Sequence, residues 1–172
     1  MEHRSLILLG LLMGQSQHGY QINEFIERNL STVTDMKKST AYATLDKLHQ
    51  QGYVDIQLAQ EGNRPTRKVY SINEKGRDYF YQLLFKNLSS AETVHYKGDI
   101  GLMFMDFLPM EKVIMALKER LTKNLKQLEA FKQTPSHETG SGVNLAVEHK
   151  IVMLEAEIAF LEKTIDKLNQ SE

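Results

Sequence analysis

The sequence predicts a mainly α-helical fold with one small β-hairpin, divided into an N-terminal winged helix-turn-helix and a C-terminal helical region. Residues 40–76 follow the order helix, hairpin, helix, because their apolar spacing changes from helical to alternating and back. Residues 99–172 contain no convincing strand pattern, and their last segment repeats apolar residues at intervals of three and four. We therefore expect a winged unit at 1–86, a junction at 87–98 and a helical dimerisation region at 99–172.

The first helix is expected from Glu2 to Met13, with Gly14 as its C-terminal cap. Its leucines lie on more than one face, which is typical of a helix buried on more than one side. A single chain offers too few partners for such a helix. We therefore predict that Leu8 and Leu12 contribute to contacts with a second copy.

Two further helices complete the predicted helix-turn-helix. One is expected at 19–29, from an apolar stripe at helical spacing. The other has Ser39 as its N-cap and ends at Gly52, a residue that adopts positive φ without strain. Leu45 marks its inner face, whereas Tyr42 fits either that face or an outward position.

A β-hairpin follows this helix. The segment from Val54 to Leu58 alternates with period two, which predicts a half-buried strand whose apolar residues face the core. Residues 69–72 are expected to form the returning strand. Either Asn73 or Ser71 is suited to cap the helix that comes next.

The C-terminal region is predicted to begin with a short apolar segment at 100–108. Pro109 suits the first turn of a helix that runs to about residue 132. Glycine, serine and proline at 133–142 indicate a loop. The last helix carries an unbroken heptad seam, formed by Val147, Ile151, Leu154, Ile158, Leu161, Ile165 and Leu168.

This seam permits two interpretations. Isoleucine at one core position, with leucine or valine at the other, favours two strands in parallel coiled coils. The alternative is an intramolecular hairpin with the preceding helix. We expect both at once, a hairpin that also packs on a second copy, so that the seven seam residues contribute to dimerisation.

Basic charge is concentrated near the predicted recognition helix and the hairpin tip. The whole chain has a net charge of −1, yet residues 37–68 hold six lysines and arginines against three acids. A specific DNA-binding protein needs such phosphate contacts, although a solvated surface is an equal alternative on charge alone. A recognition helix places its N-terminal half in the major groove. The predicted DNA-contacting residues on the helix and wing are Lys37, Lys38, Ser39, Thr40, Tyr42, Thr44, Lys47, Arg64, Arg67 and Lys68.

Other classes of function find no support in the sequence. The chain has no cysteine and its six histidines show no metal-ligand spacing, so we expect no metal and no cofactor. No nucleophile–base set or phosphate-binding glycine loop can be assigned, so we do not expect an enzyme. The longest apolar run, residues 6–13, is too short to cross a bilayer and lacks a signal-peptide cleavage site. We expect a cytoplasmic protein without membrane contact.

Several segments resemble those of PadR-type transcriptional regulators. They are His18-Gly19-Tyr20, the helix pattern Tyr42-x-x-Leu45-x-x-Leu48-x-x-x-Gly52, and the wing Arg64-Pro65-x-Arg67-Lys68-x-Tyr70 followed by Glu74-Lys75-Gly76. The resemblance covers residues 5–86, and the C-terminal helices are similar to the dimerisation region of that family. Two positions depart from the family pattern. Ala43 stands where proline is common, and Thr66 lengthens the wing, which puts in doubt which wing residue reaches DNA.

The resemblance implies a sequence-specific DNA-binding regulator, usually a repressor, that binds a palindromic operator as a homodimer. Some members respond to small aromatic compounds, which makes four residues candidate effector contacts: His18, Tyr20, Phe104 and Phe107. More often such residues cap a helix or fill the core. Members with a tryptophan on the last helix use it to sandwich flat drugs, and this chain has no tryptophan. The alternative function is a helical protein–protein interaction module whose winged domain does not bind DNA.

Overall fold

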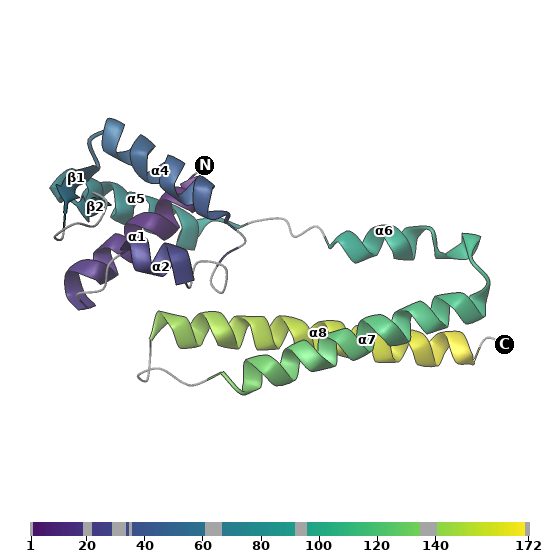
Figure 1. The fold of residues 1–172 in the computed structure, drawn as a ribbon. Coiled ribbons are helices and arrows are strands. Elements are labelled where there is room, and N and C mark those ends of the chain that lie inside the picture. The colour runs from purple at the N-terminus through teal and green to yellow at the C-terminus, as the bar shows by residue number, and fades with distance from the viewer. Residues whose placement is uncertain are drawn as a thin grey trace. The chain divides into compact units, whose positions relative to one another are not determined.

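The computed structural model describes residues 2–18, 22–28, 34, 36–60, 67–91, 96–134 and 141–170. Its elements form two compact units, Met1–Glu92 and Thr93–Glu172, and the division falls inside the predicted junction. The two strands pair as one antiparallel hairpin, and the other regular elements of the described residues are helical (Figure 1). The predicted fold class is therefore confirmed.

The N-terminal unit is a winged helix-turn-helix built around its first helix. Its elements are α1 (Glu2–His18), α2 (Ile22–Arg28), α4 (Lys38–Gln50), β1 (Val54–Ala59), β2 (Arg67–Ile72) and α5 (Glu74–Ser89). Helix α1 contacts α2, α4, α5 and β2, so it occupies the centre of the unit. It also continues through Gly14 to His18, which corrects the predicted end at Met13. Gly14 does not adopt the positive φ of a helix cap, so the helix does not stop there.

The side chains of Leu8 and Leu12 lie inside this unit. Their exposed fractions are 0% and 1%, and they share a core with residues of α2, α4, β1, β2 and α5. The prediction that they contact a second copy is therefore wrong. The strands and α5 surround α1 and supply the apolar partners that one chain was expected to lack.

Helix α4 ends where the sequence predicts but begins earlier. Lys38 is its first residue and Lys37 its N-cap, so Ser39 lies inside the helix and does not cap it. At the other end Gly52 has a φ of 77°. The Tyr53 backbone N–H then donates to the Leu48 carbonyl, near the end of α4, at 2.9 Å. This turn leads directly into β1.

The hairpin packs on the core along only part of its length. Val54 pairs with Ile72 and Ile56 pairs with Tyr70, and the side chains of Val54 and Tyr70 are buried. Leu58 was predicted to face the core, but its exposed fraction is 74%. Because exposure rises along β1 from Val54 to Leu58, the strand runs out past the core at that end.

The start of α5 is fixed by a side-chain cap and a close backbone approach. Asn73, one of the two predicted caps, accepts a hydrogen bond from the Gly76 N–H at 2.9 Å. Its amide donates to the Gly52 carbonyl at 3.1 Å. Gly76 is buried against the Tyr53 carbonyl and the Ile72 side chain, which leaves no room for a Cβ. The turn before β1 and the helix after β2 are thus held together.

The C-terminal unit is a helical hairpin with a short helical lead-in. Its elements are α6 (Lys97–Met103), the short 3-10 helix η1 (Met105–Phe107), α7 (Met110–Lys132) and α8 (Gly142–Asn169). Helices α7 and α8 pack side by side in opposite directions (Figure 1). Pro109 is the N-cap of α7 and not a residue of its first turn.

The second half of the heptad seam packs within this unit. Leu161 and Ile165 of α8 pack on Val113, Ile114 and Leu117 of α7. Ion pairs from α7 to α8 flank the contact, and one joins the Arg120 guanidinium to Glu157 at 2.5 Å. The intramolecular alternative that the sequence left open is therefore confirmed for this half of the seam.

The first half of α8 keeps more apolar surface. Its seam residues are only partly buried: Val147, Ile151 and Leu154. Leu145 and Val152 beside them are exposed. Packing of the seam on a second copy stays a prediction.

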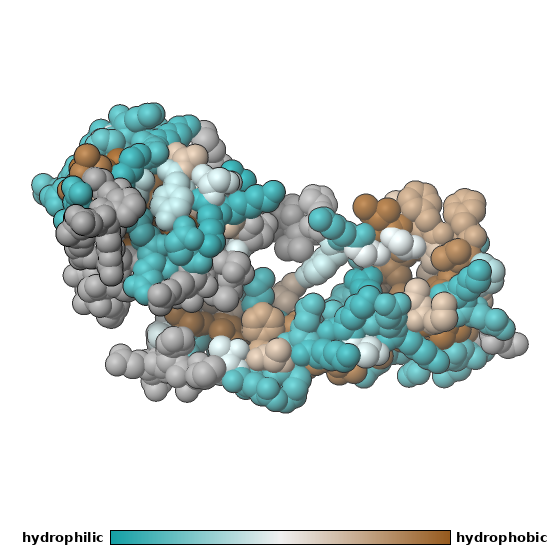
Figure 2. Space-filling model, viewed as in Figure 1, coloured by the Kyte–Doolittle hydropathy of each residue, from teal (hydrophilic) through white to brown (hydrophobic). Residues whose placement is uncertain are grey.

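Helix α6 and η1 also carry exposed apolar side chains, which appear as brown surface in Figure 2. They are Ile100, Met103, Phe104 and Phe107. The alternative that Phe104 and Phe107 fill a core is thus not met within their own unit, whereas Met105 between them packs partly against the α7–α8 core. Across the described ranges, every helix is too short or too polar to span a bilayer.

Candidate nucleic-acid interface

Helix α4 presents two opposite faces. Ala41, Leu45 and Leu48 are buried in the core, which fixes the helix in place. The other side carries four exposed residues at helical spacing, which we call the α4 ridge: Ser39, Ala43, Lys47 and Gln50. Because the core does not depend on these side chains, the ridge has the exposure that a recognition helix needs to enter a major groove.

A groove of about 650 Å³ separates the α4 ridge from the start of α1. Its α4 side includes four of the predicted DNA-contacting residues: Ser39, Thr40, Thr44 and Lys47. Its α1 side is lined by Glu2, Arg4 and Ser5. Thr44 is less available than predicted, because its hydroxyl donates to the Thr40 carbonyl at 2.7 Å.

Arg4 is a cation of this surface that the sequence did not single out. It lines the groove beside α4 and also a second groove shared with Lys37 and Thr40. Glu2, the acid that lines the same groove, pairs with Lys86 of α5 at 2.7 Å, which offsets its negative charge. That hydrogen bond from Lys86 also lowers the pKa of Glu2. In the sequence Arg4 is only a charge before an apolar run, and the packing of α1 on α4 brings it to the site.

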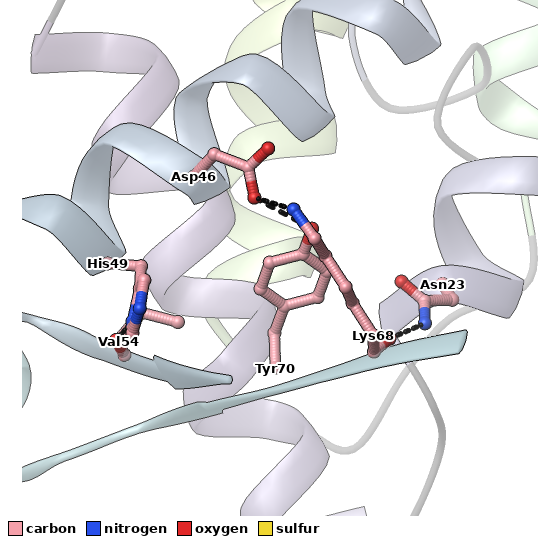
Figure 3. Close-up of polar contacts among 6 residues, drawn as sticks. All are labelled: Asn23, Asp46, His49, Val54, Lys68 and Tyr70. Atoms are coloured by element: carbon pink, nitrogen blue, oxygen red, sulfur yellow. Dashed lines mark hydrogen bonds and ion pairs between the residues drawn. The ribbon is translucent and has the colours of Figure 1, made fainter. Parts of the chain in front are cut away.

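On the other side of α4, a second depression separates the helix from the wing strand β2. Figure 3 shows the polar contacts within it. The Lys68 ammonium lies 2.7 Å from the Asp46 carboxylate, and the Tyr70 hydroxyl donates to the same carboxylate oxygen at 3.2 Å. The side-chain amide of Asn23 donates to the Lys68 backbone carbonyl at 2.5 Å. One carboxylate and one amide thus connect α2, α4 and β2.

These contacts determine the protonation of the groups involved. The hydrogen bond from Lys68 holds the pKa of Asp46 below its usual value, so this carboxylate stays ionised at neutral pH. Burial, followed by the nearby Asp46 charge, raises the pKa of Tyr70 to about 12. Tyr70 therefore keeps its proton and remains a hydrogen-bond donor. Lys68 was predicted to contact a DNA phosphate, and in this structure its charge is already paired.

A similar arrangement holds the start of α4. The Lys38 ammonium lies 2.7 Å from one carboxylate oxygen of Glu27 in α2, and the Tyr42 hydroxyl donates to the other at 3.3 Å. The bond from Lys38 lowers the pKa of Glu27. The sequence allowed Tyr42 either a core position or an outward one in contact with DNA. In the structure Tyr42 is partly buried, which is intermediate between the two.

The remaining predicted DNA contacts are described only in part. Lys37 is exposed. Arg67 lies at the start of β2 opposite Ala59, but its side chain is not described, and Arg64 falls outside the described residues. The structure thus places Ser39, Thr40, Thr44 and Lys47 on one groove, while Lys38 and Tyr42 lie on the other flank of α4, paired with Glu27. Contact with DNA stays a prediction for all ten residues.

The candidate effector residues are not brought together by the described residues. Phe104 and Phe107 are exposed in the C-terminal unit, with ring centroids 6.4 Å apart. His18 is the last residue of α1 and its side chain is not described, and Tyr20 falls outside the described residues. Among the side chains that the structure describes, no group of three or more histidines and acids could hold a metal ion.

Comparison with known proteins gives a consistent result. Residues 8–82 match the model of the Transcriptional regulator PadR-like family. The chain is similar to the negative transcriptional regulator PadR of Bacillus subtilis, with 24% identity over 121 residues that span 70% of this chain and 66% of that protein.

The fold is similar to that of solved structures. One is Bacillus subtilis PadR in complex with operator DNA, with a TM-score of 0.76, 18% identity, and coverage of 98% of this chain and 99% of that chain. Another is the same regulator in complex with p-coumaric acid, with a TM-score of 0.71, 16% identity, and coverage of 96% and 97%. At these identities the likeness shows a common fold.

Proposed function

We propose that this chain is a sequence-specific DNA-binding regulator that represses transcription, because its residues 8–82 match the model of the PadR-like family of transcriptional regulators. The α4 ridge carries this proposal, because it is exposed at helical spacing, borders a groove with cations, and is anchored by a buried opposite face. That geometry suits a helix that enters a major groove. The Bacillus subtilis relative is named as a negative regulator and has been solved with operator DNA, which supports repression.

The α4 ridge would supply the base contacts. Ser39 and Gln50 carry groups that hydrogen-bond to base edges, and the Ala43 methyl suits apolar contact with a thymine methyl. Lys47 suits a guanine edge or a phosphate. Arg4 and Lys37, in the grooves toward α1, would add contacts to the backbone, which position a protein on DNA without reading its sequence.

A second copy of the chain would complete the C-terminal unit. Apolar side chains remain exposed on the first half of α8 and on α6 and η1, and such patches on a soluble chain mark interaction sites. A two-fold dimer would present two α4 ridges to the half-sites of a palindromic operator, spaced by one DNA turn or a multiple. Such a regulator would work in the cytoplasm, and we propose no enzymatic activity for it.

A small aromatic effector would act through this dimer. Bacillus subtilis PadR has been solved with p-coumaric acid, a phenolic acid, and Phe104 and Phe107 offer exposed aromatic faces in this chain. To release the operator, the effector must bind better to the dimer form whose ridges are wrongly spaced. A hundredfold loss of operator affinity corresponds to a coupling free energy of about 2.7 kcal/mol.

A salt titration tests the proposed function. We expect the DNA upstream of the coding region of this chain to contain an inverted repeat. The protein is titrated with a duplex carrying that repeat, and with a scrambled duplex of the same composition. We expect affinity for both duplexes to fall steeply with salt, and the repeat to be bound more tightly throughout. The exposed apolar surface of α6 also fits the alternative, a protein–protein interaction module. Failure to bind either duplex at low salt would favour that alternative.

A further inference from the structure

We propose that Asp46 is a positioning residue that couples the wing to the α4 ridge and sets operator specificity by holding the Lys68 ammonium away from DNA phosphates. The inference rests on the proposed function and deepens it, since it assigns a role to an acid within a cationic DNA-binding surface. It also reverses the role that the sequence predicts for Lys68. The contacts that carry it are drawn in Figure 3.

Asp46 attaches α4 to the wing strand at two points. Lys68 and Tyr70 are two positions apart on β2, so their side chains project from the same face of the strand. Both bond to one Asp46 oxygen, at 2.7 Å and 3.2 Å. Because both bonds end on one oxygen, they hold this part of β2 close to α4, and the Asn23 amide of α2 supplies a second anchor point for the strand.

At this point of the hairpin, polar contacts take the place of core packing. Lys68 pairs across the sheet with Leu58, whose side chain is 74% exposed. The hairpin has therefore left the apolar core at Lys68, while Tyr70, the other residue that Asp46 contacts, is still within it. Asn23 of α2 holds the backbone carbonyl of the same lysine at 2.5 Å. Two helices thus hold one residue of the wing, by its side chain and by its main chain.

The ion pair matters more for charge than for stability. The side chains of Lys68 and Asp46 are 48% and 41% exposed, and hydrated pairs of this kind add little stability. Non-specific DNA binding is almost entirely a count of phosphate contacts, and pairing with Asp46 removes one cation from that count. Operator binding also needs base contacts in a fixed geometry, for which a held wing is an advantage. The same pair therefore lowers non-specific affinity and supports specific affinity.

The variant Asp46→Asn tests this inference, with Asp78→Asn on the exposed side of α5 as its matched control. Both changes remove one negative charge from the N-terminal unit. Affinities for operator and scrambled duplexes are measured across salt concentrations. For Asp46→Asn we expect the salt slope on scrambled DNA to steepen by about 0.9, because Lys68 gains a phosphate contact. We expect operator affinity to fall about tenfold, and Asp78→Asn to shift both duplexes slightly and alike.

A double-mutant cycle and a DNA-free measurement separate charge from position. In a Lys68→Gln background, Asp46→Asn should no longer steepen the slope, because there is no ammonium to release. Amide hydrogen exchange should become faster in β2 of Asp46→Asn, while the amides of α7 stay unchanged. Lys68→Gln removes the same ion pair from the strand side and should loosen β2 in the same direction, even if Asp46→Asn does not fold.

Two results would overturn the inference. One is an equal change in affinity for operator and scrambled DNA, and the other is unchanged exchange in β2. A wild-type protein that binds neither duplex would instead overturn the proposed function. Faster exchange of β2 in Asp46→Asn would in that case still support the positioning role, so the two failures are distinguishable.

Discussion

Gly76→Ala should strongly destabilise the N-terminal unit, because this residue of α5 packs against backbone. A Cβ at position 76 would overlap the Tyr53 carbonyl oxygen and lie 2.9 Å from Cγ1 of Ile72. A side-chain tip would rotate away, but a carbonyl in the turn before β1 moves only if β1 moves. The same carbonyl accepts the Asn73 backbone N–H at 3.4 Å, so a shift would also weaken that bond.

The magnitude follows from the cost of overpacking. Extra methyl groups in tightly packed sites cost about 1–3 kcal/mol of stability. Because the obstacle here is backbone, we take the upper value of about 3 kcal/mol. Replacing a helical glycine with alanine returns about 1 kcal/mol of helix propensity, which leaves a net loss of about 2 kcal/mol. For a unit of this size each kcal/mol lowers the unfolding midpoint by roughly 4–8 °C, so we expect a fall of roughly 8–16 °C.

Thermal unfolding followed by circular dichroism measures this effect, and two other glycines provide graded controls. A Cβ at Gly101 in α6 meets no atom within 4 Å, and a Cβ at Gly10 in α1 meets a ring carbon of Phe80 at 3.3 Å. Gly101→Ala should leave the midpoint unchanged or raise it. Gly10→Ala should change stability by less than about 1 kcal/mol, because the ring gives way and helix propensity compensates. If Gly76→Ala is as stable as Gly10→Ala, the backbone yields and the reasoning is refuted.

Three further outcomes are expected. Ile158→Asp should unfold the α7–α8 hairpin, because it places a charge at a buried position; the loss of helical circular dichroism measures this, and Val152→Asp at an exposed position of α8 is the control for folding. Arg4→Ala should weaken binding to operator and scrambled duplexes alike and reduce the salt slope by about one unit, whereas an effect on the operator alone would mean that Arg4 reads bases. Stability should fall as pH rises from about 10 to about 12, because the pKa of Tyr70 is raised from 10.0 to about 12 in the folded state. The neutral hydroxyl stabilises the fold fully below pH 10, and that stabilisation is lost as pH rises through the folded value; denaturant titrations over this range should show a smaller fall for Tyr70→Phe.

Apolar periodicity was sufficient to predict the elements whose pattern is strong and whose ends carry distinct signals. Helix α4 ends at Gln50, just before the positive-φ turn at Gly52, and α7 and α8 form a hairpin. Periodicity reports that a face is buried, but not which partner buries it. The pattern therefore assigns Leu8 and Leu12 to a second copy, although their own unit buries them. In the same way, the seam residues Leu161 and Ile165 pack on α7 of their own chain.

The site could be predicted only as far as one helix determines it. The spacing of Ser39 to Lys47 places these residues together without reference to the rest of the fold. The pairing of Lys68 with Asp46 joins residues 22 positions apart, and it exists only once β2 lies beside α4. A charge count over the segment adds both residues to the total, whereas their contact removes them from the charge available to DNA.

Under the proposed function, the two faces of α4 separate folding from recognition. Ala41, Leu45 and Leu48 anchor the helix, while the α4 ridge supports none of the core. Substitutions at exposed positions of this kind usually change stability by less than about 0.5 kcal/mol. After a gene duplication, a copy of this chain can therefore explore new target sequences through four codons without first acquiring compensating mutations. The same separation makes the four ridge positions suitable for randomisation when the protein is to be retargeted to chosen DNA sites.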